Sequence, residues 1–249
     1  MTLQRYFLEV AYHGKGLSGF QIQDNAITVQ SCVEHAFDVF FRKQIALTGS
    51  SRTDAGVHAY QNFFHFDWEG VFDNSVLYNL NALLPSGIVI KSVKKVSRES
   101  HARFDALSRR YGYMIYRKKD PFLLDRGWYY PYELDQVLLQ KMAAFVLSAT
   151  YFESFSKRNT QVKTYECRLI HSQWLITGEG MKYEVEGNRF LRGMVRALVS
   201  SMLQVSRGNK TESWFYDLFA KGKLNQADFS APPQGLFLER VVYSDNIWR

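Results

Sequence analysis

Cysteine is scarce in this sequence: among 249 residues only Cys32 and Cys167 occur, and they lie far apart. They form no Cys-x-x-Cys pair, and the six histidines have no metal-ligand spacing. This composition excludes a disulfide framework and predicts no structural metal site. No apolar run approaches the roughly 20 residues of a membrane span, and we expect no signal peptide ahead of Arg5. These absences predict a cytoplasmic protein with reduced thiols and no membrane partner.

The chain carries an excess of positive charge. Lys and Arg number 31 against 24 Asp and Glu, which gives a formal net charge of +7 and a pI of about 9.3. Such an excess favours a polyanionic partner. Aromatic residues make up 16% of the chain, and nucleic-acid bases stack on aromatic rings. Charge and rings together therefore favour nucleic acid over a membrane surface.

Hydrophobic periodicity divides the first half of the chain into strands and helices. Thr28 is predicted to cap a helix with the apolar stripe Val29, Val33, Ala36, Phe37 and Phe40. Asp73 or Asn74 caps a second helix, which stops at Pro85. The predicted elements are a strand over 5–12, a helix from 28, strands over 45–48 and 62–68, a helix over 76–84 and a strand over 88–96.

The second half follows the same order without repeating the sequence. Its predicted elements are a strand over 109–118, a loop over 121–131, a helix over 137–149, a hairpin of strands 165–177 and 181–186 around Gly178-Glu179-Gly180, a helix over 191–206 ended by Gly208, a short helix over 212–220 and a strand over 236–243. Apart from the short extra helix, each half has the order β-α-β-β-α-β, the ferredoxin-like arrangement.

We therefore predict an α+β fold of two ferredoxin-like (RRM-like) units, whose antiparallel sheets lie side by side and form a basic cleft. The N-terminal domain is predicted over residues 1–104, and the C-terminal domain, with the extra helix, over 105–249. A fold of this kind hosts many functions, so the function must be argued from particular residues.

The segment 49–59 interrupts the pattern between two predicted strands. Its Gly, Ser, Thr and Asp content is typical of a loop with specific backbone requirements, and it is longer than the about two to five residues of a plain hairpin. Arg52 and Asp54 are two residues apart, so their side chains leave an extended chain on the same side. A guanidinium keeps a neighbouring carboxylate ionised. Asp54 is then either a nucleophile or the capping residue of a turn.

Basic residues gather at several places and are candidates for RNA phosphate contacts. On a helix over 191–206, extended back to Arg189, residues Arg189, Arg192 and Arg196 would fall within a wedge of roughly 60°. The same wedge is equally compatible with a solvated helix face. The other candidates for RNA binding are Arg103, Arg109, Arg110, Lys157 and Arg158.

The run 51–59, Ser-Arg-Thr-Asp-Ala-Gly-Val-His-Ala, resembles the signature of the tRNA pseudouridine synthase A family, whose catalytic aspartate lies in that run. The likeness continues in the family's order through segments 19–21, 80–85, 101–106, 109–113, 190–196 and 231–236. The nine-residue run is the specific part, and the later segments support it by their order and spacing.

The resemblance implies a cofactor-free isomerisation of uridine to pseudouridine, by a homodimer, on the 3′ side of the anticodon stem-loop of tRNA. Asp54 would be the nucleophile or would stabilise the detached sugar, and Arg52 would orient it. The match to the family's Arg-Arg-Tyr implies that Tyr111 stacks on the target base and is a candidate for proton transfer. The match to Met-Val-Arg makes Arg196 a second cation near the carboxylate.

The chain departs from the family pattern at five positions that carry none of this chemistry. His13, Phe20, Gly87, Tyr151 and Ser200 stand where Asp, Trp, Asp, Asp and Gly are usual. Two other functions stay open from the residues alone. A non-catalytic tandem RRM-like RNA-binding protein accounts for the charge, the aromatics and the fold. A glycoside hydrolase would need a second positioned carboxylate, and none lies in or beside the 51–59 run.

Overall fold

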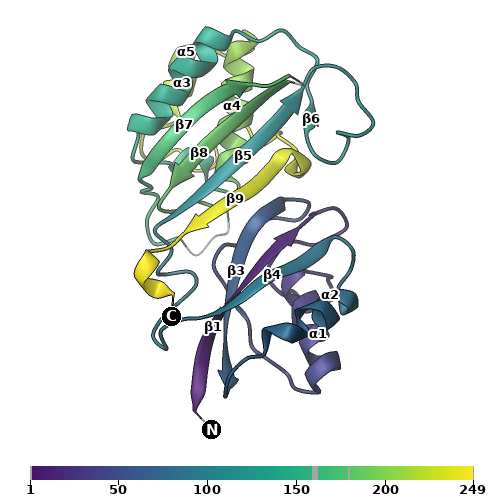
Figure 1. The fold of residues 1–249 in the computed structure, drawn as a ribbon. Helices are drawn as coiled ribbons and strands as arrows, with labels where there is room; N and C mark the ends of the chain where they lie inside the picture. Colours follow the sequence, from purple (N-terminus) through teal and green to yellow (C-terminus); the bar gives the residue numbers. More distant parts are fainter. Residues whose placement is uncertain (1, 159–161, 179, 249) are drawn as a thin grey trace. The chain divides into compact units, whose positions relative to one another are not determined.

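The computed structural model describes residues 2–158, 162–178 and 180–248. The fold is mixed α/β, and the chain divides into two compact units (Figure 1). Unit 1 comprises Met1–Leu107 and Leu238–Arg249, and unit 2 comprises Ser108–Phe237. The domains 1–104 and 105–249 stay a prediction; the compact units differ from them chiefly because the last residues of the chain belong to unit 1. No helix in the described part is long and apolar enough to cross a membrane.

Unit 1 is built around the strand β1. β1 pairs antiparallel with β4 on one side and with β3 on the other, and β3 also pairs antiparallel with β2. The elements in chain order are β1 (Leu3–Tyr12), α1 (Val29–Phe41), β2 (Thr48–Gly49), β3 (His58–Glu69), a 3-10 turn (Asn74–Val76), α2 (Leu77–Leu83), β4 (Ile88–Lys95) and a C-terminal 3-10 turn (Asp245–Ile247).

Helix α1 forms as its sequence predicts, with one exception. Thr28 is the N-cap, and its side chain accepts a hydrogen bond from the amide of Ser31. The predicted apolar residues are fully buried except Phe40, which is 37% exposed. Phe40 lies in the last turn of the helix, and its exposed ring packs edge-to-face on that of Phe41 with centroids 4.8 Å apart.

The strands around the 49–59 segment differ from their predicted bounds. No strand covers 45–47, because side chains of α1 form hydrogen bonds with the backbone amide and carbonyl of Leu47, which therefore do not pair with another strand. Glu34 accepts from the amide of Leu47 at 3.1 Å, and Gln30 donates to its carbonyl at 3.0 Å. β3 begins four residues earlier than predicted, at His58. The loop is thereby shortened to residues 50–57.

The chain's last strand, β9 (Leu236–Val242), begins in unit 2 and returns to unit 1. Tyr243 follows it and donates its hydroxyl to the carbonyl of Ala102 at 2.6 Å. Its ring lies 5.2 Å from both Phe7 and Phe63. The C-terminal residues therefore complete the hydrophobic core of unit 1.

Unit 2 is built around β5, which pairs antiparallel with β8, and β8 pairs antiparallel with β7. β6 pairs with β5 in parallel, while the other strand pairs described here are antiparallel. The elements are β5 (Ser108–Tyr116), β6 (Trp128–Tyr129), α3 (Gln136–Ser148), a 3-10 turn (Glu153–Phe155), β7 (Leu169–Ile176), β8 (Gly180–Gly187), α4 (Met194–Ser206), α5 (Glu212–Asp217) and a 3-10 turn (Pro233–Gly235).

Two predictions for unit 2 need correction. The loop over 121–131 contains the strand β6. β7 starts at Leu169 instead of 165, because the preceding residues bond elsewhere: Cys167 donates its amide to the carbonyl of Thr150. Val137 lies in α3 as predicted, and its side chain is 81% exposed. The predicted hairpin turn includes Glu179, which lies outside the described residues.

The predicted arginine wedge is also wrong. α4 begins at Met194, because Gly193 has a left-handed backbone with φ of +78° and interrupts the helix. Arg189 and Arg192 lie in the segment before it, and only Arg196 is helical. Eleven of the 13 residues of α4 are buried, so the helix has no broad solvated face.

Candidate functional site

The loop that carries Asp54 is fixed to its neighbours by backbone hydrogen bonds. Phe20 donates its amide to the carbonyl of Thr53 at 3.2 Å, and Val57 donates to the carbonyl of Asp54 at 3.2 Å. Asp54 itself is half-buried, whereas Arg52 is exposed. The loop thus holds its carboxylate partly out of water on a well-connected backbone. The pairing of Arg52 with Asp54 stays a prediction.

A buried polar network lies beneath this loop. Asn62 of β3 is 0% exposed and bonds to the N-terminal end of the segment, at Ser50 and Ser51. Its Nδ2 donates to the carbonyl of Ser51 at 3.0 Å and to the hydroxyl of Tyr12 at 3.1 Å, and its Oδ1 accepts from the hydroxyl of Ser50 at 2.7 Å. The hydroxyl of Tyr12 also shares a 2.7 Å hydrogen bond with that of Thr53. Because buried polar groups need partners, this network specifies the backbone on the N-terminal side of Asp54.

Two glycines let neighbouring backbone approach the loop closely. Gly19 has φ of +98°, and a Cβ there would lie 2.9 Å from the carbonyl oxygen of Thr53. A Cβ on Gly14 would lie 2.3 Å from the carbonyl oxygen of Val57. Any larger residue would displace the loop. The Gly14 amide also donates to Nδ1 of the buried His58 at 3.0 Å, which fixes the loop's other end.

The departures in unit 1 are accommodated by this packing. Phe20 is 1% exposed and its ring stacks on Phe64 with centroids 4.3 Å apart. Gly49 makes room for it, since a Cβ there would lie 2.3 Å from the Phe20 ring. The ring of His13 lies 4.4 Å from that of His58, and its amide donates to the carbonyl of Gly87. These residues support the loop without entering it.

The other residues to which the resemblance assigns chemistry, Tyr111 and Arg196, belong to unit 2. Tyr111 lies on β5, is 8% exposed and packs edge-to-face on Phe190 with ring centroids 5.1 Å apart. Arg196 lies in the first turn of α4, and its Nε donates to the carbonyl of Ala231 at 2.7 Å. Each side chain is therefore oriented within its own unit. That they meet Asp54 in one site is a proposal, taken up below.

The predicted RNA-binding residues differ in their surroundings. Arg109 is 9% exposed and donates to the carbonyl of Asn188 at 2.8 Å, and Arg110 forms an ion pair with Glu186 at 3.1 Å. Lys157 and Arg192 are brought together by a backbone hydrogen bond of 3.1 Å. The exposed residues of the set are Arg103, Arg158 and Arg192, and Arg189 is half-buried. RNA contact by all of them stays a prediction.

In the part of the chain that the structure describes, none of the titratable groups with a clear pKa shift is a residue of the 50–57 loop. Burial raises the pKa of the Cys167 thiol to about 11. Burial and the neighbouring His101 lower the pKa of His65 to about 4. His65 accepts from the amide of Ala102 at 3.1 Å and thereby fixes the end of unit 1's first segment. Among the described residues, no group of three or more His, Cys, Asp or Glu side chains has an arrangement that could hold a metal ion.

Comparison with known proteins relates the whole chain to one family. A family model described as tRNA pseudouridine synthase matches residues 149–244. The tRNA pseudouridine synthase A of Parabacteroides distasonis is 38% identical over 248 residues, covering 99% of this chain and 98% of that protein. The protein of the same name from Porphyromonas gingivalis is 37% identical and covers 99% and 100%. That of Staphylococcus epidermidis is 35% identical and covers 96% and 91%. The similarity spans both units.

Proposed function

The chain belongs to the tRNA pseudouridine synthase A family, and from this premise we propose that Asp54 is its catalytic carboxylate. The protein is an isomerase that converts uridine in tRNA to pseudouridine. The observation that carries the proposal is the placement of Asp54, half-buried on a loop that Asn62 bonds at the carbonyl of Ser51 and Tyr12 bonds at the hydroxyl of Thr53. A positioned carboxylate is the group that such a site needs at an anomeric carbon.

The reaction rearranges one bond and requires no net addition. The bond between ribose C1′ and N1 of uracil breaks, with the carboxylate of Asp54 attacking C1′. The base rotates in the site, and C5 displaces the carboxylate from C1′. A proton then leaves C5, and N1 is left protonated, so the product is an isomer of the substrate. No oxidant, reductant or group donor is consumed.

We assign supporting roles to three residues. Arg52 orients Asp54, and Arg196, whose Nε is held by the carbonyl of Ala231, provides a second positive charge near it. Tyr111 stacks on the uracil, and its hydroxyl relays the proton from C5 by giving up its own proton as it accepts that one. These roles require the two units to contribute to one site. The edge-to-face contact of Tyr111 with Phe190 supports a fixed ring at that position.

The fold and the partner complete the proposal. We propose that both units are ferredoxin-like, and the strand order β4-β1-β3-β2 with two helices in unit 1 supports this proposal. The RNA would be the anticodon stem-loop of tRNA, bound by phosphate contacts to the basic residues given above. We further propose a cytoplasmic homodimer, as the family resemblance implies.

The test is turnover of uridine in an unmodified tRNA transcript, mapped by carbodiimide labelling and primer extension. Wild type should form pseudouridine in the anticodon stem-loop. Asp54→Asn is nearly isosteric but has no anionic nucleophile, so it should bind tRNA and show no measurable turnover. Asp24→Asn, a change at an exposed loop residue of the same unit, is the control and should retain full activity. Ready turnover by Asp54→Asn would remove Asp54 from the catalytic role.

A further inference from the structure

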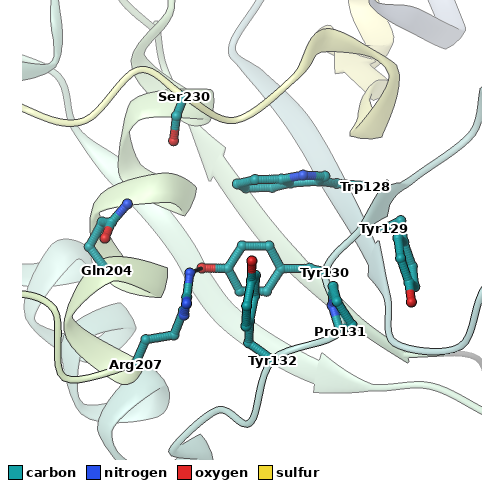
Figure 2. Close-up of a pocket in the computed structure, with 8 residues that line it drawn as sticks. All are labelled: Trp128, Tyr129, Tyr130, Pro131, Tyr132, Gln204, Arg207 and Ser230. Carbon is teal, nitrogen blue, oxygen red and sulfur yellow. Dashed lines mark hydrogen bonds between the residues drawn. The ribbon is translucent and has the colours of Figure 1, made fainter.

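Unit 2 contains an aromatic pocket to which nothing above assigns a role. Its volume is about 390 Å³, within the range of small-ligand sites. β6 and the residues after it form one wall, α4 and its C-terminal end another, and the segment before β9 a third (Figure 2). The lining residues are Trp128, Tyr129, Tyr130, Pro131, Tyr132, Gln204, Arg207 and Ser230.

The rings of this pocket are held at angles to one another. Trp128 and Tyr130 lie 4.6 Å apart at 65°, and Tyr130 and Tyr132 lie 5.0 Å apart at 72°. Tyr130 is buried and contacts both of the other two rings, whereas Tyr132 is 46% exposed. Edge-to-face packing uses the edges of some rings and leaves faces of others available to a flat ligand.

Arg207 supplies a cation to the same pocket. Its guanidinium carbon lies 3.4 Å from the centroid of the Tyr132 ring, and Figure 2 shows the two planes side by side. Its Nη1 donates to the hydroxyl of Tyr130 at 3.5 Å. Within the described residues, no ion pair joins Arg207 to a carboxylate. Aromatic faces and the hydroxyl of Tyr130 therefore contact the guanidinium of Arg207 without neutralising its charge, which leaves it able to attract an anionic ligand.

The pocket wall that contains Ser230 leads directly to Ala231, the residue whose carbonyl holds the side chain of Arg196. Asp228 accepts from Gln204 Nε2 at 2.9 Å and from the amide of Ser230 at 2.8 Å. The next residue, Ala231, accepts from Nε of Arg196 at 2.7 Å. Ser200 adds a hydrogen bond of 2.5 Å to the carbonyl of Asp228. A molecule in the pocket would thus contact the segment that positions Arg196.

We propose that this pocket binds an unpaired base of the tRNA substrate, at a nucleotide other than the uridine that is isomerised. Aromatic rings beside an arginine that has no carboxylate partner are suited to binding single-stranded RNA, with the base on an aromatic face and its phosphate near the guanidinium. The polyanionic charge of tRNA complements Arg207 and the net charge of +7. The proposal rests on the enzyme's action on tRNA and adds a second recognition site for it.

The test compares tRNA affinities at one fixed salt concentration. Tyr132→Ala should weaken binding of an unmodified tRNA transcript about 5- to 150-fold, the range for one base on one aromatic ring. Tyr132→Phe keeps the ring and should bind like wild type. Arg207→Gln keeps the length of the side chain, removes its charge and should also weaken binding. Tyr78→Ala removes a tyrosine that is 81% exposed in unit 1 and is the matched control.

The outcomes separate this proposal from its alternatives. Wild-type affinity in both Tyr132→Ala and Arg207→Gln would overturn it, and circular dichroism establishes that each variant is folded. If these two variants keep the tRNA affinity of wild type but have a smaller sedimentation coefficient than wild type, the proposal is overturned and the pocket is an interface between copies of the chain. Failure of the proposed function appears elsewhere, as absent turnover by wild type, and does not alter these affinities.

Discussion

The replacement Tyr12→Phe removes one oxygen atom from beneath the Asp54 loop and leaves the ring in place. In wild type that oxygen accepts from Asn62 and bonds to Thr53. Without it, two buried polar groups lose a partner, at about 1–3 kcal/mol each, or about 2–6 kcal/mol in total. A typical protein has about 5–15 kcal/mol of stability, so the variant should fold. We expect a loss of activity larger than this destabilisation explains.

That expectation follows from geometry. Thr53 is the residue directly before Asp54, so a shift of Thr53 moves the carboxylate as well. A displacement of about 1 Å at a reacting group costs up to roughly 10²-fold in rate. Tyr6→Phe is the matched control: Tyr6 lies on the same strand, is 4% exposed against 5% for Tyr12, and accepts from the amide of Phe72 at 3.0 Å. Both variants should lose stability, and only Tyr12→Phe should lose the rate of the chemical step.

The assay is single-turnover release of tritium from tRNA labelled at C5 of uridine, with enzyme in excess, beside urea unfolding of each variant. Since the loop is displaced and RNA contacts are intact, tRNA affinity should hardly change. A Tyr12→Phe enzyme with the stability loss of Tyr6→Phe and a wild-type rate would show that the network stabilises the unit without positioning Asp54.

Two further predictions concern single side chains. Tyr111→Phe keeps the packing on Phe190 but lacks the hydroxyl, so it should lose roughly 10²–10⁴-fold in the single-turnover rate with little change in tRNA affinity; a rate within a few-fold of wild type would reduce Tyr111 to a stacking surface. His65 should make the protein acid-sensitive. Its folded pKa of about 4 lies below the ordinary 6.5, so the unfolded chain binds the proton first, and stability should fall as pH drops from 6.5 toward 4. His65→Gln should flatten this slope in urea midpoints measured at several pH values, and parallel profiles for variant and wild type would contradict the assignment.

Local signals in the sequence were sufficient for much of the fold. The helix at Thr28 was predictable because a capping residue and a 3.6-residue apolar period coincide there. The 50–57 loop was predictable because its glycines and Asp54 interrupt two apolar alternations. These features are encoded within a few residues of one another, and the backbone follows them directly.

The errors arise where a backbone conformation or a contact distant in the sequence overrides the local apolar pattern. The apolar period of α4 continues back to Leu191, yet Gly193 adopts a left-handed backbone and the helix starts after it. Leu47 has the composition of a strand residue, but Glu34 occupies its amide. Asn62 and Tyr12 are separated by 50 residues, so no local pattern joins them. The signal that could have led to this network is Asn62 itself, a polar residue on the same strand face as Phe64 and Phe66.

The return of the C-terminal residues to unit 1 has a consequence for the order of events on the ribosome. Residue 107 ends the first segment of unit 1, and the segment that completes its core begins at residue 238. At about 5–20 residues per second, synthesis of the intervening chain takes on the order of 10 s. During that time Phe7 and Phe63 lack the ring of Tyr243 that covers them in the finished protein. Unit 2, made from one continuous segment, can fold while the unit that carries Asp54 still waits for the last residues of the chain.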